Sequence, residues 1–421
     1  MRAAVVGAGP SGIMAAIAAA SLGAEVSLFD KNEFPGRKLL LTGNGKCNFS
    51  NVSVSDENYR GSLKDSLYVK KIYEEYGPEW LLNFFSSCGL LYKVKNSGYY
   101  PLSNVSNTVN DVLIEELKRL KVSFHGNTLV KKIERDKGLF FLSLEHMDSN
   151  KRSRDETGFD ALIIATGGKA APKTGSTGDG YYFAESFGLS VAEPLPALTR
   201  LNSPDPFFND NKIRAEVSLT LYIDGKASGT SEGELQLSET GPSGICVFDL
   251  SGRAAKALKE GKKCDLNMDL LPGTTKEELK RLIEKRYSDL SGFFNPDKLF
   301  IGIFSERLSL NVREYLERRV FKSEFPSSLS SEDMDRIASE IKDMSFEITG
   351  TGDFNNAQVT SGGVLASSLN PDLSAVNIPG LYFCGEVLDT DGDCGGFNLQ
   401  WAFSSGYAAG VNAVKNHDTD K

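Results

Sequence analysis

Apolar residues at the start of the chain predict a strand, a helix and a second strand. A short apolar run over Ala3–Val6 ends in glycine, as expected for a buried parallel strand. The Ala-rich segment from Pro10 to about Leu22 predicts a helix. Val26–Phe29 predicts the next strand, which leads into Asp30. This order predicts the beginning of a parallel α/β sheet.

The middle of the chain has a different pattern. Residues 216–223 and 233–237 alternate polar and apolar side chains, which predicts antiparallel strands with one solvated face. From Thr274 the apolar spacing becomes helical, with a capping box expected at Thr274 and Glu277. Further helices are predicted over residues 305–320 and 331–344, and two more strands over 160–165 and 380–384.

These patterns predict an interrupted domain. A Rossmann-like α/β domain is expected from residues 1–190 plus 353–421, with an insert over 191–352. Within the insert we expect β-barrel-like antiparallel strands at about 191–255 and 345–352, and a small helical subdomain at about 256–344.

Composition and charge narrow the class of protein. The chain has 421 residues, of which 40% are hydrophobic and 24% charged, as is ordinary for a globular enzyme. The net charge of −9 argues against a nucleic-acid partner, which would need clustered Lys and Arg. No apolar run approaches the ~18–20 residues of a membrane span. No signal peptide precedes the first strand, so we expect cytoplasmic residence and no membrane partner.

No metal site is predicted. The six cysteines are scattered without C-x-x-C spacing and are expected to be reduced thiols. Asp389, Asp391 and Asp393 resemble the start of a calcium loop, but Cys394 and Gln400 stand where that loop needs Gly and Glu. The three histidines argue against a mechanism based on histidine.

The first strand is joined to the first helix by a G-x-G-x-x-G motif at Gly7, Gly9 and Gly12. Gly7 permits the tight turn, Gly9 lets the backbone approach a pyrophosphate, and Gly12 lets the helix pack on the strand. The free N–H groups at the start of the helix attract phosphate. Asp30 ends the second strand, where a carboxylate accepts hydrogen bonds from an adenosine ribose. The motif in this context predicts a dinucleotide site.

Two later segments favour FAD over NAD. The chain has one complete G-x-G-x-x-G, which is consistent with one permanently bound dinucleotide. Residues 159–168 resemble the Ala-Thr-Gly element of flavoproteins with two dinucleotide-binding domains. Residues 380–386 resemble the late strand of those flavoproteins, whose terminal acid, here Glu386, holds the ribityl or diphosphate part of FAD.

With these segments in place, the chain resembles the bacterial NAD(P)/FAD-dependent oxidoreductase family that includes aminoacetone oxidase and the BaiN-type bile-acid reductases. Residues 36–48 match a family block in which Thr42 and Lys46 replace the usual Ser and Arg, and further blocks cover 178–184, 233–244, 357–364 and 385–402. The resemblance implies a Rossmann-like FAD-binding domain interrupted by a β-barrel-like insert with a helical subdomain. It leaves the substrate open.

The cofactor is expected to contact several of these segments. Arg37 and Lys38 are placed to balance the pyrophosphate charge, with a solvated basic loop as the alternative. The last helix is expected to start at residues 395–399 and to continue through Ala409. Its start is expected to face the N1–C2=O edge of the flavin, where the helix dipole raises the electron affinity of the flavin; the alternative is a helix that only closes the core. The predicted cofactor residues are Gly7, Gly9, Pro10, Ser11, Gly12, Asp30, Lys31, Arg37, Lys38, Leu39, Thr42, Gly43, Gly45, Lys46, Cys47, Asn48, Val130, Ala165, Thr166, Gly167, Gly168, Gly385, Glu386, Asp391, Gly395, Gly396, Phe397, Asn398 and Leu399.

Substrate contacts are predicted at Tyr181, Tyr182, Gly362 and Gly363, in a cavity over the flavin between the nucleotide domain and the insert. Cys47 and Cys394 are near the predicted flavin loops, and packing is favoured over a redox or covalent role for their thiols.

The predicted function is an FAD-dependent oxidoreductase that transfers hydride to or from flavin N5 on a small molecule. Either an amine is oxidised with O2, or an activated C=C bond is reduced with NAD(P)H as a transient electron donor. The alternative is a non-catalytic flavin-binding redox sensor or interaction module. A third option is tRNA-modifying or hydroxylase-type flavoprotein chemistry, of which the acidic net charge disfavours the tRNA-modifying version.

Overall fold

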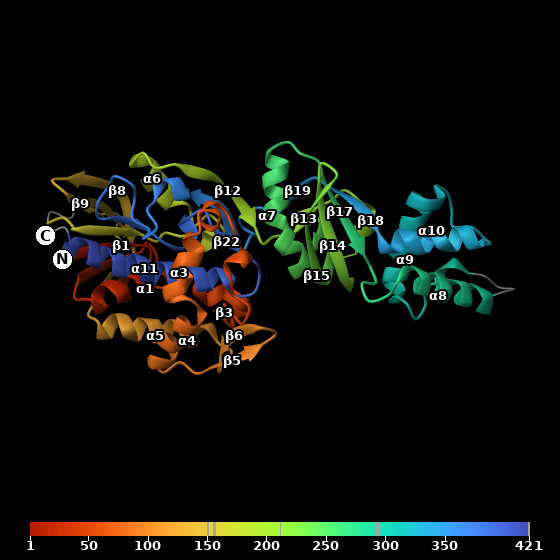
Figure 1. The fold of residues 1–421 in the computed structure, drawn as a ribbon, viewed down its shortest axis with the longest axis horizontal. Coiled ribbons are helices and arrows are strands. Elements are labelled where there is room, and N and C mark those ends of the chain that lie inside the picture. Colours follow the sequence, from red (N-terminus) through yellow and green to blue (C-terminus); the bar gives the residue numbers. More distant parts are fainter. Residues whose placement is uncertain (150, 155–156, 211, 291–294, 420–421) are drawn as a thin grey trace. The chain divides into compact units, whose positions relative to one another are not determined.

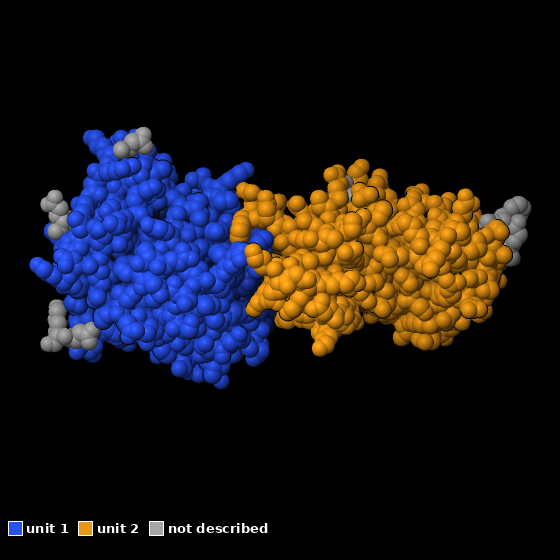
Figure 2. Space-filling view, turned by 90° about the horizontal axis from the view of Figure 1, so that it is seen from above, with its two compact units in different colours: residues 1–196, 357–421 blue, residues 197–356 orange. Residues whose placement is uncertain are grey.

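The computed structural model describes residues 1–149, 151–154, 157–210, 212–290 and 295–419. The chain forms two compact units, shown in different colours in Figure 2. Unit 1 consists of Met1–Pro196 and Ala357–Lys421, and unit 2 of Ala197–Asn356.

Unit 1 is built on a five-stranded parallel sheet in the order β21-β11-β1-β2-β7. The predicted strand–helix–strand beginning is confirmed, with β1 at Arg2–Val6, α1 at Pro10–Ser21 and β2 at Glu25–Phe29. All four residues of β11 are buried, as expected where both faces of a parallel sheet are covered. The other strands are β7 (Ser123–His125), β11 (Ala161–Ile164) and β21 (Leu381–Phe383).

The last helix packs along the first. Figure 1 shows α1 and α11 (Phe397–Thr419) on the same side of β1, while β8 and β9 lie on the other side. A Cβ added to Gly406 of α11 would stand 2.2 Å from the carbonyl oxygen of Ser11, and one on Gly410 would stand 2.3 Å from that of Ala15. Glycine at these two positions therefore lets the two helix backbones touch. In the described part of the chain, no helix is both long and apolar enough to cross a membrane.

Smaller elements surround this sheet. The helices are α2 (Ser62–Asp65), α3 (Tyr68–Tyr76), α4 (Pro78–Ser87), α5 (Ser106–Arg119) and α6 (Asp179–Ser186). The strands form four small sheets: β8 (Thr128–Asp136), β9 (Leu139–His146) and β10 (Lys151–Arg154); β3 (Ser50–Asn51), β6 (Gly98–Pro101) and β5 (Tyr92–Lys95); β4 (Tyr59–Arg60) with β22 (Asp391–Gly392); and β12 (Val191–Ala197) with β20 (Val359–Val364).

Unit 2 combines an antiparallel sheet with helices, and it has its own hydrophobic core. The sheet order is β16-β15-β14-β17-β18, and Val217, Leu219 and Leu221 of β14 are buried on the inward face, as the alternating pattern predicts. The elements are β13 (Leu201–Asn202), β14 (Arg214–Ile223), β15 (Lys226–Ser238), β16 (Gly241–Ser243), β17 (Cys264–Asp269), β18 (Met344–Ile348), β19 (Gly350–Thr351), α7 (Ile245–Lys259), α8 (Lys276–Asp289), α9 (Glu306–Leu316) and α10 (Ser331–Lys342).

Two helix boundaries in unit 2 differ from the prediction. The capping box of α8 is formed by Thr275 and Glu278, one residue later than expected. The N–H of Thr274 donates to the carbonyl of Leu271, so Thr274 completes a turn and the next threonine caps the helix. The helix predicted over 305–320 is α9 only to Leu316, and a π-helical turn over Glu317–Phe321 continues it.

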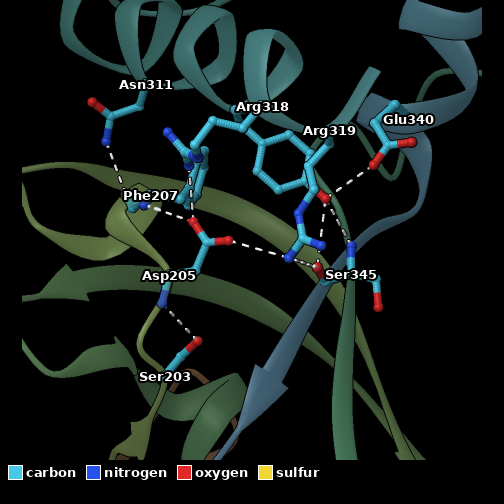
Figure 3. A network of polar contacts seen from close by, with 9 residues as sticks. Ser203, Asp205, Phe207, Asn311, Arg318, Arg319, Glu340 and Ser345 are labelled. Atoms are coloured by element: carbon cyan, nitrogen blue, oxygen red, sulfur yellow. Dashed lines mark hydrogen bonds and ion pairs between the residues drawn. The ribbon is translucent and has the colours of Figure 1, made fainter. Parts of the chain in front are cut away.

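A nearly buried carboxylate connects the strand and helix parts of unit 2 (Figure 3). Asp205 accepts hydrogen bonds from the N–H of Phe207 at 2.9 Å, from Arg318 at 2.9 Å and from Arg319 at 3.3 Å. Its side chain is 10% exposed, and both arginines come from the π-helical turn. Asn311 of α9 also donates to the carbonyl of Phe207 at 2.9 Å.

We expect Asp205→Ala to lower the free energy of unfolding of unit 2 by about 1–3 kcal/mol. The substitution removes the acceptor of the Phe207 N–H and of Arg318, and it leaves Arg319 with only the more distant carbonyl of Ser345 as an acceptor among the described residues. Urea unfolding of the full chain, followed by circular dichroism, measures the change. Glu234→Gln is the control, since its ion pair with Arg214 joins two half-exposed side chains and should matter little. Equal losses in the two variants would contradict this role of Asp205.

Candidate cofactor site

The glycines of the first loop have different surroundings. Gly7 has φ +104°, and a Cβ there would stand 2.4 Å from the carbonyl oxygen of Ala165. A Cβ on Gly12 would stand 1.8 Å from the carbonyl oxygen of Gly7. For Gly9, the N-cap of α1, no described protein atom beyond its chain neighbours lies within 4 Å of the position of an added Cβ. Gly7 and Gly12 thus serve the packing of the loop, whereas Gly9 opens a space at the N-terminus of α1, where phosphate binds in Rossmann folds.

Asp30 organises the loop beside this space. Its Oδ2 accepts the N–H of Ala8 at 2.6 Å, and its Oδ1 accepts the N–H and the Nδ2 of Asn32 at 2.7 and 2.9 Å. Three of about four acceptor sites of the carboxylate are therefore used within the protein. No described residue uses the remaining acceptor site on Oδ2, which is therefore available to a ribose hydroxyl. The N–H of Thr128 donates to the carbonyl of Asp30 at 2.8 Å, which brings β8 and Val130 to the same edge.

Lys38 is paired with the predicted acid of the late strand. Its Nζ lies 2.6 Å from Oε2 of Glu386, and Oε1 of Glu386 accepts the N–H of Thr360 at 2.9 Å. Thr360 Oγ1 in turn accepts the N–H groups of Lys169 and Ala170 at 2.8 and 3.0 Å. These contacts join segments at residues 38, 168–170, 360 and 386. Thr360 was not among the predicted site residues, although it lies within residues 357–364, which resemble a block of the family.

The other cations have different partners. Arg37 is exposed and donates to Oδ1 of Asn32 at 2.9 Å, and Lys31 forms an ion pair of 2.6 Å with Asp179 at the start of α6. Their predicted contacts with the pyrophosphate and adenosine remain proposals.

Gly385 meets the first turn of α1. A Cβ on Gly385 would stand 2.3 Å from Oγ of Ser11, and the N–H of Gly385 donates to Oγ of Ser405 at 3.0 Å. The indole N–H of Trp401 donates to the carbonyl of Gly385 at 3.3 Å. The glycine loop, the Ala165–Gly168 turn and Gly385–Glu386 therefore lie together at the carboxyl ends of β1, β11 and β21, the edge where α/β sheets bind ligands.

The N-terminus of α11 begins as predicted, at Phe397 after two glycines. Gly395 and Gly396 have φ +126° and +104°, and a Cβ on Gly396 would stand 2.5 Å from the carbonyl oxygen of Ser50. Asn51 Nδ2 donates to the carbonyl of Gly395 at 2.9 Å, and Ser50 Oγ donates to the buried Oε1 of Gln400 at 2.6 Å. The segment after Cys47 is thus fixed to the first turn of α11. Ser50, Asn51 and Gln400 carry no sequence signal beyond being polar.

Several buried polar atoms around this edge have no hydrogen-bond partner among the described residues. They include Asn48 Oδ1, Thr166 Oγ1 and Asp391 Oδ1, all on predicted cofactor residues, and the hydroxyl of Tyr181. Buried polar groups are nearly always satisfied in native proteins, because an orphan costs roughly 1–3 kcal/mol. A dinucleotide has the hydroxyl, phosphate and pyrimidine groups to satisfy them. With the open space at Gly9, Asn48 Oδ1 and Thr166 Oγ1 make the edge fit FAD.

Burial shifts the acidity of three side chains here. It raises the pKa of the Cys47 thiol to about 12, so this thiol stays protonated, in keeping with a packing role. It raises the pKa of Asp391 to about 6. Burial, reinforced by the charge of Glu386, also raises the pKa of Tyr181.

The four predicted substrate residues differ in their surroundings. Tyr181 is buried near Glu386, whereas the neighbouring Tyr182 is 59% exposed. Gly362 and Gly363 have positive φ, and added Cβ atoms would stand 2.5 Å from the carbonyl oxygens of Glu193 and Val387. Backbone packing explains both glycines, and a substrate contact for any of the four remains a proposal.

Comparison with known proteins agrees with this geometry. Residues 1–412 match the family described as HI0933-like protein Rossmann domain. The chain is similar to a 3-dehydro-bile acid delta(4,6)-reductase of Clostridium scindens, with 32% identity over 98% of this chain and 99% of the relative. It is also similar to a ribosomal RNA dihydrouridine synthase of Escherichia coli, with 27% identity over 97% of each chain.

Among solved structures, a 3-ketosteroid delta1-dehydrogenase of Sterolibacterium denitrificans has a similar fold, with a TM-score of 0.52 and 13% identity over 98% of this chain and 99% of that one. At this identity the likeness concerns the fold alone.

Proposed function

The chain belongs to the HI0933-like Rossmann-domain family, and on that basis we propose that it reduces a carbon–carbon double bond conjugated to a carbonyl group in a small molecule. The predicted family and fold class are confirmed, and so is the class of FAD-dependent oxidoreductase. The choice of reduction over amine oxidation and NAD(P)H as the electron donor belong to the proposal.

We base the choice of reduction over amine oxidation on one observation. The two relatives named above are similar to this chain over 97–98% of its length, and their names describe related chemistry. A delta(4,6)-reductase of a 3-dehydro bile acid saturates double bonds in a ring system that bears a ketone. A dihydrouridine synthase saturates the ring double bond of uridine, which adjoins a carbonyl. A double bond polarised by a carbonyl accepts hydride readily, so one flavin site can serve both substrates.

The residues at the cofactor edge support this chemistry by position and charge. Bound FAD supplies hydride exchange at N5. Gly9 and the N-terminus of α1 would hold the pyrophosphate, and Lys38 would offset its charge while it pairs with Glu386. The N-terminus of α11 would stabilise negative charge on the flavin pyrimidine, because its first N–H groups have no partner within the helix.

A second candidate is the same reduction on uridine within RNA, which the similarity to the Escherichia coli enzyme favours. The net charge of −9 opposes it, because RNA binding is driven largely by neutralisation of phosphates. Small-molecule reduction is therefore our first proposal.

Anaerobic stopped-flow absorbance tests the proposal. We expect NADH or NADPH to bleach the oxidised-flavin spectrum of the purified protein, and cyclohexenone or a steroid enone to restore it. Bleaching by small amines and recovery with O2 alone would show an amine oxidase instead. A flavin that neither nicotinamides nor amines reduce would favour the redox sensor. Recovery only with uridine-containing RNA would favour the second candidate.

A further inference from the structure

The two-stranded ribbon of β4 and β22 contains a buried donor and a buried acceptor atom for which the described residues supply no hydrogen-bond partner. Arg60 and Asp391 stand directly opposite each other in its antiparallel register. Directly opposite residues point their side chains to the same face of such a pair. Arg60 Nε and Asp391 Oδ1 are both buried, and neither has a hydrogen-bond partner among the described residues. Asp391 is 3% exposed.

The neighbouring charged groups are committed elsewhere. The Nη2 of Arg60 forms an ion pair with Asp393, which leaves its Nε–H unused. Asp389 accepts the N–H of Ser62 at 2.8 Å, at the start of α2. Asp391 is therefore the one member of this acidic triplet whose described contacts include neither a direct ion pair nor a backbone N–H.

The surroundings of Asp391 favour the neutral form of its carboxyl group more than water does. Burial raises the pKa of Asp391, Asp389 and Asp393 raise it further, and Ser361 and Arg60 act in the opposite direction. The elements packed on β22 add few charges: β4 contributes Tyr59 and Arg60, while β20 and the first two turns of α11 have no ionisable side chain. A protonated Asp391 donates a hydrogen bond or a proton, where an ionised one only accepts.

The ribbon is rigidly attached to the predicted flavin edge. Asn398, in the first turn of α11, accepts the N–H of Gly392 at 2.9 Å and donates to its carbonyl at 2.8 Å. Arg60 and Asp391 therefore keep a fixed position relative to the N-terminus of α11. Fixed polar groups around a reacting atom are what proton transfer requires.

We propose that Arg60 and Asp391 form the substrate-activating site, which binds the conjugated carbonyl group and protonates the carbon next to it. The inference rests on the proposed function, and it assigns Asp391, which was predicted to contact the cofactor, to the substrate. Arg60 had no predicted role.

The β carbon of the substrate gains a hydride, with its electron pair, from flavin that a nicotinamide dinucleotide has reduced. The electron pair of the double bond moves toward the α carbon and the carbonyl oxygen, and that oxygen accepts a hydrogen bond from Arg60 Nε–H. The α carbon then takes the proton of Asp391, and the carboxylate regains a proton from solvent. The double bond is reduced, and the nicotinamide is oxidised.

Three substitutions test this assignment. Asp391→Asn preserves shape but cannot give up a proton. Arg60→Lys keeps a cation for Asp393 but has no Nε–H. Asp389→Asn is the matched control, because the amide oxygen still accepts the N–H of Ser62. We expect all three proteins to contain as much FAD as the wild type.

The readouts are FAD content, infrared difference spectra and the reoxidation of chemically reduced enzyme by cyclohexenone and by uridine. The wild type should show a carboxylic-acid carbonyl band that disappears as pH rises through about 6, and Asp391→Asn should lack it. Asp389→Asn should keep the band but lose it at a lower pH, because the negative charge of Asp389 helps to raise the pKa of Asp391. Reoxidation should slow by roughly a hundredfold in Asp391→Asn, the usual size of a general-acid effect. In the wild type it should also slow as pH rises through that range, because the acid is lost. Arg60→Lys should mainly raise the KM for the carbonyl compound.

The outcomes separate the two proposals. Failure of both probes to reoxidise wild-type flavin overturns the proposed function and the substrate assignment with it. Normal reoxidation in Asp391→Asn and Arg60→Lys overturns the inference alone. Loss of FAD from these two variants, but not from Asp389→Asn, also overturns it and assigns the pair to the cofactor.

Discussion

Replacing Gly9 with valine should weaken FAD binding about a hundredfold, close to 3 kcal/mol, without unfolding the protein. The backbone at Gly9 has φ −77° and ψ −178°, an extended conformation that valine readily adopts. No described protein atom lies within 4 Å of the added Cβ, so the fold has room for the side chain. The valine side chain would therefore occupy the space at the N-terminus of α1 that is proposed to receive the pyrophosphate of FAD. Reconstitution of the apoprotein, followed by quenching of FAD fluorescence, measures the affinity.

Gly273→Val is the control for this prediction. Gly273 is in unit 2, has no described neighbour within 4 Å of its added Cβ, and has no positive φ. It should therefore tolerate valine equally well and keep the wild-type affinity for FAD. Full FAD binding by Gly9→Val would show that the pyrophosphate lies elsewhere. A collapse of the circular dichroism spectrum in Gly9→Val would show that the space is needed by the fold.

The segments that meet at the cofactor edge could be predicted from the sequence because each of them has a local sequence signal. A glycine motif between a strand and a helix specifies turn geometry over a few residues, and the apolar runs of β1, β11 and β21 mark buried parallel strands. Parallel strands align their carboxyl ends, so segments that are far apart in the chain come together once each is recognised. The α11 N-terminus follows from Gly395 and Gly396 for the same reason.

The groups that the sequence did not reveal depend on non-local contacts. Arg60 is in a strand of two residues, too short for any period, and its importance comes from the opposite strand 331 residues later. Thr360 matters because it is hydrogen-bonded both to residues 169–170 and to Glu386, two segments far apart in the chain. The capping box of α8 was misplaced by one residue because either threonine satisfies the pattern, and only the turn closed by Thr274 decides between them.

Gly406→Leu should destabilise unit 1 by about 3 kcal/mol or more, the largest loss of stability that we expect from a single helix substitution here. A Cβ at this position would stand 2.2 Å from the carbonyl oxygen and 2.9 Å from the carbonyl carbon of Ser11. Backbone atoms cannot rotate away as a side chain can, so α1 and α11 must separate. Differential scanning calorimetry of the full chain measures the loss as a lower melting temperature.

The same substitution should also reduce FAD binding, because both ends of the cofactor site depend on this helix contact. Ser11 is in the first turn of α1, beside Gly9 and Gly385, and α11 starts at the predicted flavin edge. Separation of the helices would therefore move the pyrophosphate subsite relative to the pyrimidine subsite. Ala402→Leu, at a half-buried position of the same helix, adds the same side chain without this backbone contact and should melt near the wild-type temperature. If Gly406→Leu loses stability but binds FAD with unchanged affinity, the two subsites do not depend on the α1–α11 contact, and the cofactor is held by the loops alone.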